Sequence, residues 1–306
     1  MVFTPYPKAD DRVENPTLRA SRDGSIWLKA ASVPDPIVPS PKGANAHNAD
    51  PDLVYCEGRL YVLYMTTDKA GDAEFSVVDS RDAEYWEGPR VFHRGKGCVS
   101  PACQVDGKTW HLWFIRTEPP GSNTGDPTSR LIYRRGPDLM HLGNEVVCKL
   151  EIPAYNSWHI DVQWVDSWYE ALVAAFPVGT DMSRTRLFHA TSKDGVNYTL
   201  NPPQPIIQPT TLGWDNRTIY RSTFLKNPDG TYRIWYSGGS WGRHFGIGLV
   251  QGPLESLTED PSSPLAPIGH YFTRIPEELL GLLKYQIRHL LPSALLHTVM
   301  KVYGED

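Results

Sequence analysis

The sequence predicts an all-β fold: a five-bladed β-propeller over residues 1–274, followed by a helical C-terminal tail over residues 275–306. Two interleaved repeats that return after roughly fifty to sixty residues are the main evidence, because such a period is typical of blades stacked around a common core. Up to the tail, no long segment shows the apolar period of a helix. Asp-Gly pairs add the turn chemistry of β-hairpins, at 23–24, 194–195 and 229–230.

The first repeat combines a short apolar run with a turn that ends in an aromatic residue. It reads Ser-Arg-Asp-Gly-Ser-Ile-Trp at 21–27, Ser-Arg-Asp-Ala-Glu-Tyr-Trp at 80–86 and Ser-Lys-Asp-Gly-Val-Asn-Tyr at 192–198. Two weaker copies lie near 131–142 and 246–257. We interpret this repeat as the outer half of a blade, and its final aromatic residue as packing between strands.

The second repeat is a polar start, an apolar strand, a tight turn and an aromatic strand. It begins at Asp50, Ser100, Asp161 and Arg221, and we interpret it as the inner half of a blade. The N-terminal outer half therefore lacks an inner partner. We expect either Val2–Tyr6 or Pro264–Thr273 to complete a fifth blade, because radial closure removes exposed sheet edges.

Composition and charge argue against nucleic-acid binding and against a transmembrane helix. A net charge of −5 gives no basic face for nucleic acid. No apolar run reaches the length of about eighteen residues that a transmembrane helix needs. The N-terminus lacks the basic and apolar regions of a signal peptide, so we expect synthesis in the cytoplasm. No metal-ligand spacing is visible, so we expect neither a cofactor nor a metal; a central cation where several carboxylates meet is the alternative.

The tail from Pro276 to Asp306 differs in kind from the rest of the chain. Two glutamates open an apolar helical pattern that runs from Leu279 to Leu291 and should end at Pro292. We consider three roles for this helix: packing on the propeller wall, anchoring a homo-oligomer or a larger assembly, and lying in a membrane interface.

Propeller geometry predicts where a site should lie, because the inner strands of all blades begin at one mouth. Rings that stack on sugars and charged groups that bind vicinal hydroxyls gather near these starts, which predicts a binding site for an oligo- or polysaccharide. The candidate substrate-binding residues are His47, Asp52, Ser100, Trp158, His159, Trp214, Tyr220, Arg221 and Trp241. The candidate catalytic residues are Asp50, Asp161 and Asp215.

The segment Ala49-Asp50-Pro51-Asp52-Leu53-Val54-Tyr55, with a following Gly58, Tyr61 and Tyr64, resembles the first-blade motif of five-bladed glycoside hydrolases of the arabinanase, xylosidase and invertase type. The resemblance implies that Asp50 is the general base or nucleophile and that Asp161 orients the substrate. It also implies a general-acid Glu in a later blade, where this chain has Tyr220-Arg221-Ser222. Asp215, His159 and Glu118 are the alternatives for that acid, which glycosidic hydrolysis requires.

Simpler structural roles compete with these. Asp50 precedes a proline and can cap a turn, Arg221 can pair with a channel carboxylate, and His159 can be a polar contact between blades. Asp52 fits a hydrogen-bonding role better than a catalytic one.

Two functions remain open. One is an enzyme that binds and hydrolyses a surface polysaccharide. The other is a non-catalytic receptor-binding spike or fibre component of a phage, used in host recognition and incorporated into a virion. The missing acid and the tail favour the second function, and the runs at 48–55 and 219–222 resemble phage structural proteins. A purely structural protein is a third alternative.

Overall fold

The computed structural model describes residues 1–42, 46–67, 71–119, 128–180, 182–211, 213–240 and 244–257. The chain divides into a compact unit, Met1–Tyr271, and a second unit, Phe272–Asp306. The predicted helical tail and the alternative closing segment Pro264–Thr273 lie outside the described residues. Within the described ranges, no helix is long and apolar enough to cross a membrane.

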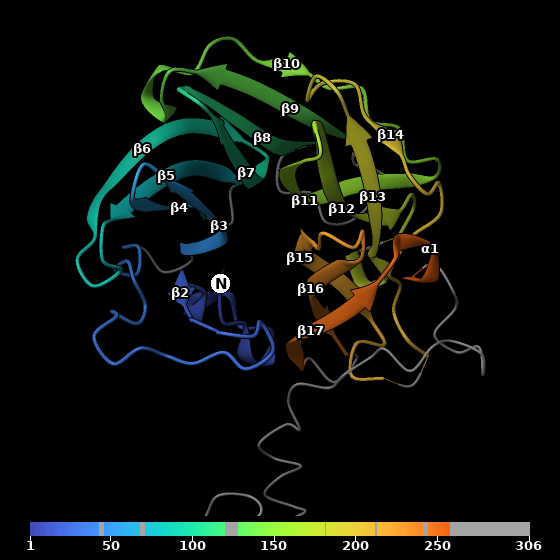
Figure 1. The fold of residues 1–306 in the computed structure, drawn as a ribbon, viewed down its shortest axis with the longest axis horizontal. Helices are drawn as coiled ribbons and strands as arrows, with labels where there is room; N and C mark the ends of the chain where they lie inside the picture. The colour runs from blue at the N-terminus through green and yellow to red at the C-terminus, as the bar shows by residue number, and fades with distance from the viewer. Residues whose placement is uncertain are drawn as a thin grey trace, which may run out of the picture. The chain divides into compact units, whose positions relative to one another are not determined.

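Four antiparallel sheets, which we call the first to fourth blades, make up most of the described fold (Figure 1). The first contains β3 (His47–Cys56), β4 (Arg59–Thr67), β5 (Asp72–Ser80) and β6 (Glu87–Lys96). The second contains β7 (Cys98–Asp106), β8 (Thr109–Glu118), β9 (Thr128–Gly136) and β10 (Val146–Val147). The third contains β11 (Tyr155–Val165), β12 (Trp168–Pro177), β13 (Arg186–Ser192) and β14 (Thr199–Leu200). The fourth contains β15 (Thr218–Lys226), β16 (Tyr232–Gly239) and β17 (Phe245–Gly252).

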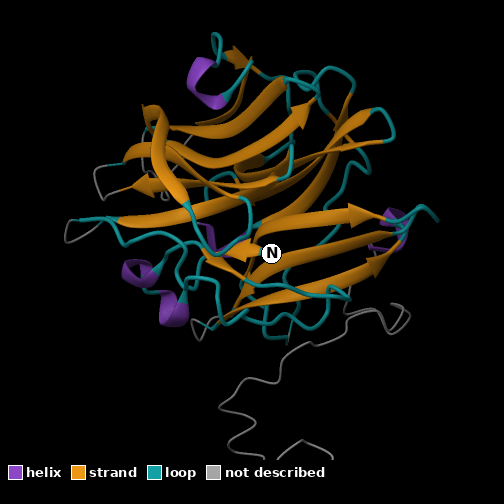
Figure 2. Ribbon diagram, turned by 60° about the vertical axis from the view of Figure 1, so that its left-hand side comes forward, coloured by secondary structure: helices purple, strands orange, loops and turns teal. Residues whose placement is uncertain are grey.

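The four sheets surround a common centre. Strands β3, β7, β11 and β15 are the innermost strands of their blades, and neighbours in this order are in contact. The turned view shows the sheets stacked face against face in the manner of propeller blades (Figure 2). The sequence prediction of an all-β, propeller-like fold is therefore confirmed, although the inner strands begin a few residues before the predicted starts.

The prediction of five blades is wrong for the described residues, which form four. The N-terminal outer half makes only a two-stranded sheet, in which β1 (Val2–Phe3) pairs with β2 (Thr17–Leu18). The opening residues thus pair as the first alternative expected. The segment that follows carries Pro34, Pro36, Pro39 and Pro41, and proline has no N–H to donate to a β-ladder. This proline density explains why residues 31–42 form turns and bends instead of further strands.

Helical structure is confined to single turns. The described part of the chain has 3₁₀ turns at Pro7–Ala9, Asp11–Val13, Leu139–His141 and Met182–Arg184, and a four-residue helix α1 (Leu254–Leu257). The first two turns lie in the N-terminal segment, Met1–Glu14, which contributes to the site described below.

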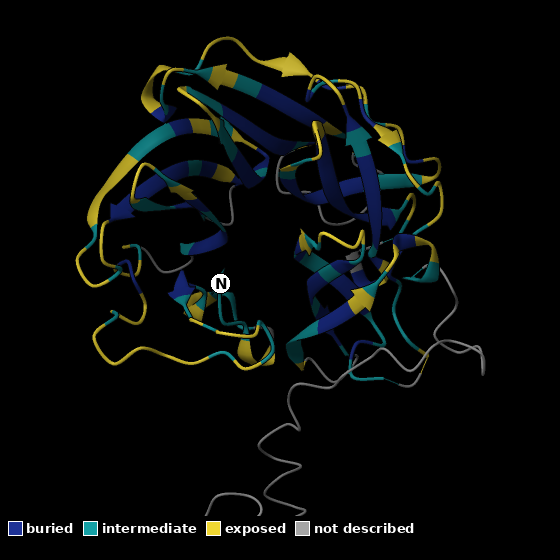
Figure 3. Cartoon of the chain, in the orientation of Figure 1, coloured by how far each residue is buried: buried dark blue, intermediate teal, exposed yellow. Residues whose placement is uncertain are grey.

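The core lies between the faces of neighbouring blades, as the burial colours of Figure 3 show. Strand β12 illustrates the cause, because successive side chains of a strand point to opposite faces. Ala171, Val173 and Ala175 pack toward the second blade, while Leu172 and Ala174 join the cluster shared with the fourth. Both faces of β12 are therefore buried, which explains why residues 171–176 are apolar without alternation.

The first sequence repeat corresponds to one recurrent turn. In each of its three strong copies, an aspartate carboxylate oxygen accepts two backbone N–H groups at 2.8–2.9 Å, and a serine hydroxyl two residues earlier accepts one or two more. The aspartates are Asp23, Asp82 and Asp194. These bonds satisfy the backbone of the turn locally, which is the physical reason for the Ser-x-Asp spacing.

Two of these turns also join neighbouring parts of the fold. Trp113 of the second blade donates its Nε1–H to the carbonyl oxygen of Gly195 at 2.7 Å, and Trp235 of the fourth blade donates in the same way to Gly24 at 2.7 Å. Gly24 and Gly195 have φ values of +72° and +74°, and a Cβ at either would lie within 2.9 Å of the tryptophan ring. Glycine is therefore required at both turns, and the second bond ties the N-terminal region to the fourth blade.

Replacing Trp113 tests this kind of tether. Trp113→Phe keeps an aromatic ring in a fully buried position but leaves the Gly195 carbonyl without its indole donor. We expect the free energy of unfolding in urea to fall by about 2 kcal/mol. Trp110→Phe is the matched control, because Trp110 is only half-buried and packs edge-on against Tyr61. Equal losses in the two variants would contradict the proposed role of the hydrogen bond.

Candidate polar site at the centre of the blades

Backbone irregularities in the inner strands direct the polar residues of the site. The register of β3 shifts between Ala49 and Asp52, and that of β7 shifts between Val99 and Ala102. Within these bulges, Asp50 and Ser100 adopt φ values of 51° and 57°. A bulge turns side chains away from the regular ladder, and a positive φ is strained for a residue other than glycine. Strain at the same point of two blades therefore marks this level as the candidate site.

The corresponding bulges of the other two blades lie at the same level. In β15 the register shifts between Ile219 and Ser222, which places Tyr220 and Arg221 in the bulge. In β11 it shifts between Ser157 and His159, so that Trp158 is the extra residue. Five predicted site residues therefore lie in these bulges: Asp50, Ser100, Trp158, Tyr220 and Arg221. His159 and Asp161 are paired in the regular ladder of β11.

Ser100 connects all four blades. Its backbone N–H donates to Asp50 Oδ2 of the first blade at 2.9 Å. Its hydroxyl oxygen accepts the backbone N–H of Ile160 in the third blade at 3.0 Å and Arg221 Nη1 of the fourth blade at 2.7 Å. The second Arg221 nitrogen donates to the Pro101 carbonyl oxygen at 2.8 Å. Ser100 is fully buried, so its predicted contact with substrate stays a prediction, while its contacts between blades are directly observed.

Asp50 lies between Ser100 and His159. One carboxylate oxygen is held by Ser100, and the other lies 3.4 Å from His159 Nδ1. His159 is almost fully buried, and its ring packs edge-on against Tyr220 with a centroid separation of 4.2 Å. Burial lowers the pKa of His159 to about 4, although the charge of Asp50 opposes this shift. The imidazole is therefore neutral near pH 7 and is a poor proton donor there.

A second pair of carboxylates lies on the same inner strands. Asp52 accepts the Cys103 backbone N–H at 2.7 Å, and Asp161 accepts the Thr223 hydroxyl at 3.0 Å. Burial, followed by repulsion from Asp161, raises the pKa of Asp52 to about 7. Burial also raises the pKa of Asp161, and the Arg221 guanidinium opposes both shifts. Both carboxyl groups of this pair are therefore protonated more readily than an exposed aspartate.

The N-terminal segment supplies a carboxyl group that sequence reasoning missed. Burial, followed by repulsion from the Asp50 carboxylate, raises the pKa of Glu14 to about 8. The Thr4 hydroxyl donates to Glu14 Oε2 at 3.2 Å. The charges of both Glu14 and Asp50, together with burial as the largest cause, raise the pKa of Tyr220 well above its usual range. Glu14 is therefore mostly protonated near pH 7, beside an aspartate of the central group.

Aromatic side chains surround Tyr220 at the centre of the site. Trp158 donates its Nε1–H to the Tyr220 hydroxyl oxygen at 3.0 Å. Tyr6, whose charge also affects the pKa of Tyr220, packs edge-on against Phe245 at 4.8 Å. Neither Glu14 nor Tyr6 lies in a repeat. The expectation that Val2–Tyr6 complete the fold was the only signal for Tyr6, and no sequence signal pointed to Glu14.

Other predicted residues lie in separate surroundings. One oxygen of Asp215 accepts the Thr210 hydroxyl at 2.5 Å, and the other accepts the Tyr236 hydroxyl at 2.8 Å. Both carboxylate oxygens are therefore engaged in a local network of the fourth blade. Trp214 stacks on Tyr236 at 5.9 Å. His47 begins β3, opposite Thr67. Trp241 lies outside the described residues.

The described residues contain no group of three or more histidine, cysteine, aspartate or glutamate side chains placed to hold a metal ion. The expectation that the chain uses neither metal nor cofactor stays a prediction.

Comparison with known proteins places this fold near carbohydrate-active enzymes. No family model matches the sequence. The chain is 28% identical over 287 residues to the A type blood N-acetyl-α-D-galactosamine deacetylase of Flavonifractor plautii, covering 77% of this chain and 37% of that protein. It thus spans little more than a third of the length of this curated relative.

Solved structures give the same picture at the level of the fold. A crystal structure of an N-acetylgalactosamine deacetylase from F. plautii, in complex with blood group B trisaccharide, matches with a TM-score of 0.75 and 22% identity over 86% of this chain and 88% of that one. A thermostable family-43 glycoside hydrolase matches with a TM-score of 0.55 and 12% identity over 66% and 70%. The fold is therefore a glycoside hydrolase-like propeller, as the first-blade motif implied. None of these relatives is a phage protein, so the phage branch has no support from them.

Ser100→Ala tests the connection between the blades. The variant removes the acceptor for the partly buried Arg221 guanidinium and for the buried Ile160 N–H. We expect a loss of about 2–4 kcal/mol in the free energy of unfolding, measured by denaturant titration. Ser222→Ala is the control, since among the described residues its hydroxyl bonds only to the Tyr220 carbonyl oxygen in the same strand. A loss at Ser100 no larger than at Ser222 would refute the connecting role.

Asp52→Asn tests the electrostatic strain of the inner carboxylates. A carboxyl whose pKa is raised by folding binds more protons in the folded than in the unfolded state, so its contribution to stability falls as pH rises. For Asp52 the fall should run from about pH 4 to about pH 7, from the unfolded to the folded pKa. We expect the wild type to lose stability relative to Asp52→Asn across this window and then to level off. Asp106→Asn, at the exposed end of β7, is the control.

Proposed function

We propose that this chain is a carbohydrate-active hydrolase that removes the acetyl group from an N-acetylated amino sugar of a cell-surface glycan. The observation that carries the proposal is the similarity in sequence, over 77% of the chain, to an enzyme named as an N-acetyl-α-D-galactosamine deacetylase. The structural match to such a deacetylase at a TM-score of 0.75 supports the same reading. The pairing of Asp50 with Glu14 gives it a chemical basis.

Asp50 is suited to act as the general base. One of its oxygens is fixed by the Ser100 N–H, and the other faces a neutral imidazole, so the carboxylate is held in one orientation. A positioned carboxylate can accept a proton from a water molecule that attacks the acetyl carbonyl carbon. In this scheme His159 is a positioning residue, because burial keeps it neutral.

Glu14 is suited to act as the general acid. Its pKa of about 8 keeps it protonated at neutral pH, while Asp50 is close enough to repel its charged form. A protonated carboxyl group beside a positioned carboxylate is a recurrent acid and base pair. We assign the acid to Glu14 rather than to Asp215 or His159, because both Asp215 oxygens accept hydrogen bonds within the fourth blade.

Tyr220 completes the proposed reaction. Its hydroxyl oxygen accepts a bond from Trp158 and keeps its own proton, which can be donated to the carbonyl oxygen as negative charge develops there. Water adds to the carbonyl carbon as Asp50 takes its proton. The carbon–nitrogen bond then breaks as Glu14 protonates the leaving nitrogen. The products are acetate and a free amino sugar.

Hydrolysis of a glycosidic bond is the second candidate, and the family-43 match and the first-blade motif favour it. The same carboxyl pair would then act on a leaving sugar oxygen. The segment Tyr220-Arg221-Ser222 stands where the resemblance requires a glutamate, so deacetylation accounts better for the residues present. A non-catalytic glycan-binding protein remains the alternative that an activity measurement decides.

The proposal is tested by incubating the purified chain with blood group A trisaccharide and measuring acetate, free amine and reducing sugar separately. The assay is run as purified, after chelation, and with single divalent cations restored, because metal-bound water is a common nucleophile in such reactions. We expect acetate and amine in equal amounts. Reducing sugar without acetate would indicate a glycosidase, and binding without any product would leave only the carbohydrate-binding reading.

Variants at the two carboxyl groups test their assigned roles. We expect Asp50→Asn to lower kcat/KM by a factor of about 100 to 10,000, the usual contribution of a positioned base. Because Glu14 must be protonated to act, wild-type kcat/KM should fall as pH rises through about 8. Glu14→Gln should lower the rate and abolish this alkaline limb. A limb that persists in Glu14→Gln would remove Glu14 from the mechanism. Asp215→Asn is the control, expected to change stability more than the pH profile.

A further inference from the structure

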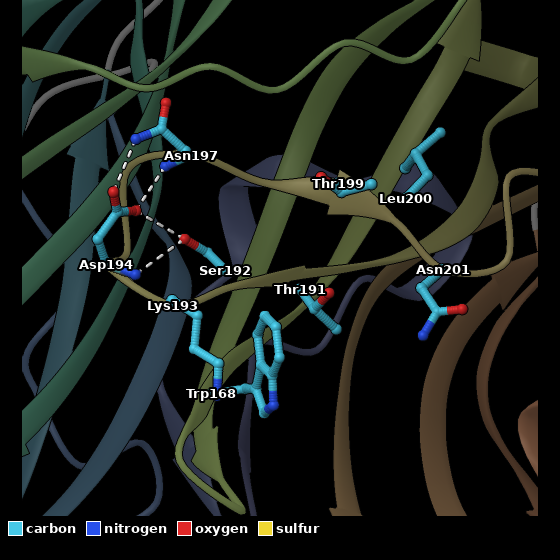
Figure 4. Close-up of a pocket in the computed structure, with 9 residues that line it drawn as sticks. All are labelled: Trp168, Thr191, Ser192, Lys193, Asp194, Asn197, Thr199, Leu200 and Asn201. Carbon is cyan, nitrogen blue, oxygen red and sulfur yellow. Dashed lines mark hydrogen bonds between the residues drawn. The ribbon is translucent and has the colours of Figure 1, made fainter.

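A hollow of about 500 Å³ lies on the outer edge of the third blade, apart from the residues of the central site (Figure 4). It is formed by the start of β12, the end of β13, the recurrent turn that follows, and β14. Pockets that hold small ligands commonly measure roughly 300–1,000 Å³. We propose that this hollow is a second binding site, which takes a neutral saccharide ring of a glycan chain.

Trp168 provides the stacking surface. Trp168 is 39% exposed and lines the hollow, so part of its indole is accessible to a ligand there. Lys193 Nζ lies 3.6 Å from the ring centroid and donates to the Ser167 carbonyl oxygen at 3.3 Å. This contact orients the indole from one side. Figure 4 shows the Trp168 ring between Lys193 and Thr191, with Asn201 farther along on the side of Thr191.

The polar lining divides into side chains that are engaged and side chains that are available. Ser192, Asp194 and Asn197 are engaged in the turn, where Asp194 accepts the backbone N–H groups of Val196 and Asn197 and the Asn197 amide. Thr191, Thr199 and Asn201 also line the hollow, and no hydrogen bond of their side chains is present among the described residues. Two hydroxyls and an amide beside an indole match the alternating donors and acceptors of a sugar ring.

The charges of the residues that line the hollow favour a neutral ligand. Lys193 and Asp194 are the charged residues of the lining, and they carry opposite signs. The hollow therefore offers no net charge to attract a phosphate, a sulfate or a carboxylate. An aromatic surface with neutral polar groups around it favours an uncharged saccharide over a nucleotide or an acidic peptide.

A matched position on the same hairpin offers an internal control. Trp164 is 50% exposed, but it lies opposite Tyr169 in the ladder and packs edge-on against that ring at 4.6 Å. Trp168 neighbours Tyr169 in β12, and adjacent residues of a strand point to opposite faces. The two exposed tryptophans therefore lie on opposite faces of the third blade, and Trp164 is not part of the hollow.

The experiment is ¹⁹F NMR of the chain labelled with 5-fluorotryptophan, whose resonances are assigned by single Trp→Phe variants. Blood group A trisaccharide is titrated into the wild type and into Asp50→Asn. We expect the Trp168 resonance to shift saturably in both proteins and the Trp164 resonance to stay fixed. The probe is chosen from the proposed function, but the readout needs no turnover, so failure of catalysis and failure of this site are separate results.

Two substitutions that spare the tryptophan complete the test. Thr191→Val and Asn201→Ala remove side-chain groups that the fold does not use among the described residues, so both variants should fold. Each is expected to weaken the Trp168 titration about fivefold, equivalent to the loss of one hydrogen bond. No shift at Trp168, a shift that both variants leave unchanged, or a shift given by inorganic phosphate and not by the trisaccharide would overturn the proposal.

Discussion

The site depends on one constraint: four inner strands from distant parts of the chain meet at Ser100. Its backbone N–H holds Asp50, its hydroxyl holds Ile160 and Arg221, and each partner comes from a different blade. The positive φ of Ser100 costs on the order of 1 kcal/mol or more in backbone strain. The conformation persists because bonds from three other blades fix it at once. Without this meeting point, the carboxylates would have no common orientation.

A crowded set of acidic groups follows from that convergence. Asp50, Asp52, Asp161 and Glu14 approach the centre, and Arg221 is the cation that acts on Asp52 and Asp161. Burial and mutual repulsion leave some of these groups protonated near neutral pH. A protonated carboxyl next to an ionised one is what acid–base chemistry requires. The inward meeting of the blades therefore creates the reactivity of the site as well as its shape.

The repeats made much of this predictable from sequence. The periods located the inner strands, and with them Asp50, Ser100, Asp161 and Arg221, because a repeated pattern implies a repeated position. The same reasoning predicted one blade too many, because it counted the copy at Ser21 as a complete outer half. The prolines that follow this copy prevent further strands from forming there. Asp215 shows a further limit: its distance from β15 in sequence is short, but the loop turns its oxygens to Thr210 and Tyr236. Glu14 was missed because it belongs to no repeat.

The N-terminal segment joins closure of the fold to assembly of the site. Asn15, next to Glu14, accepts a bond from Asn48 at 2.9 Å and donates to the Val38 carbonyl oxygen at 2.9 Å. Asn48 lies two residues before Asp50, so this bond links the backbone that carries the proposed acid to the backbone that carries the proposed base. On the other side, Trp235 of the fourth blade holds the turn at Gly24. The segment that fills the space between the first and fourth blades therefore also delivers the carboxyl group, and any loosening of that closure should separate Glu14 from Asp50 before the blades themselves unfold.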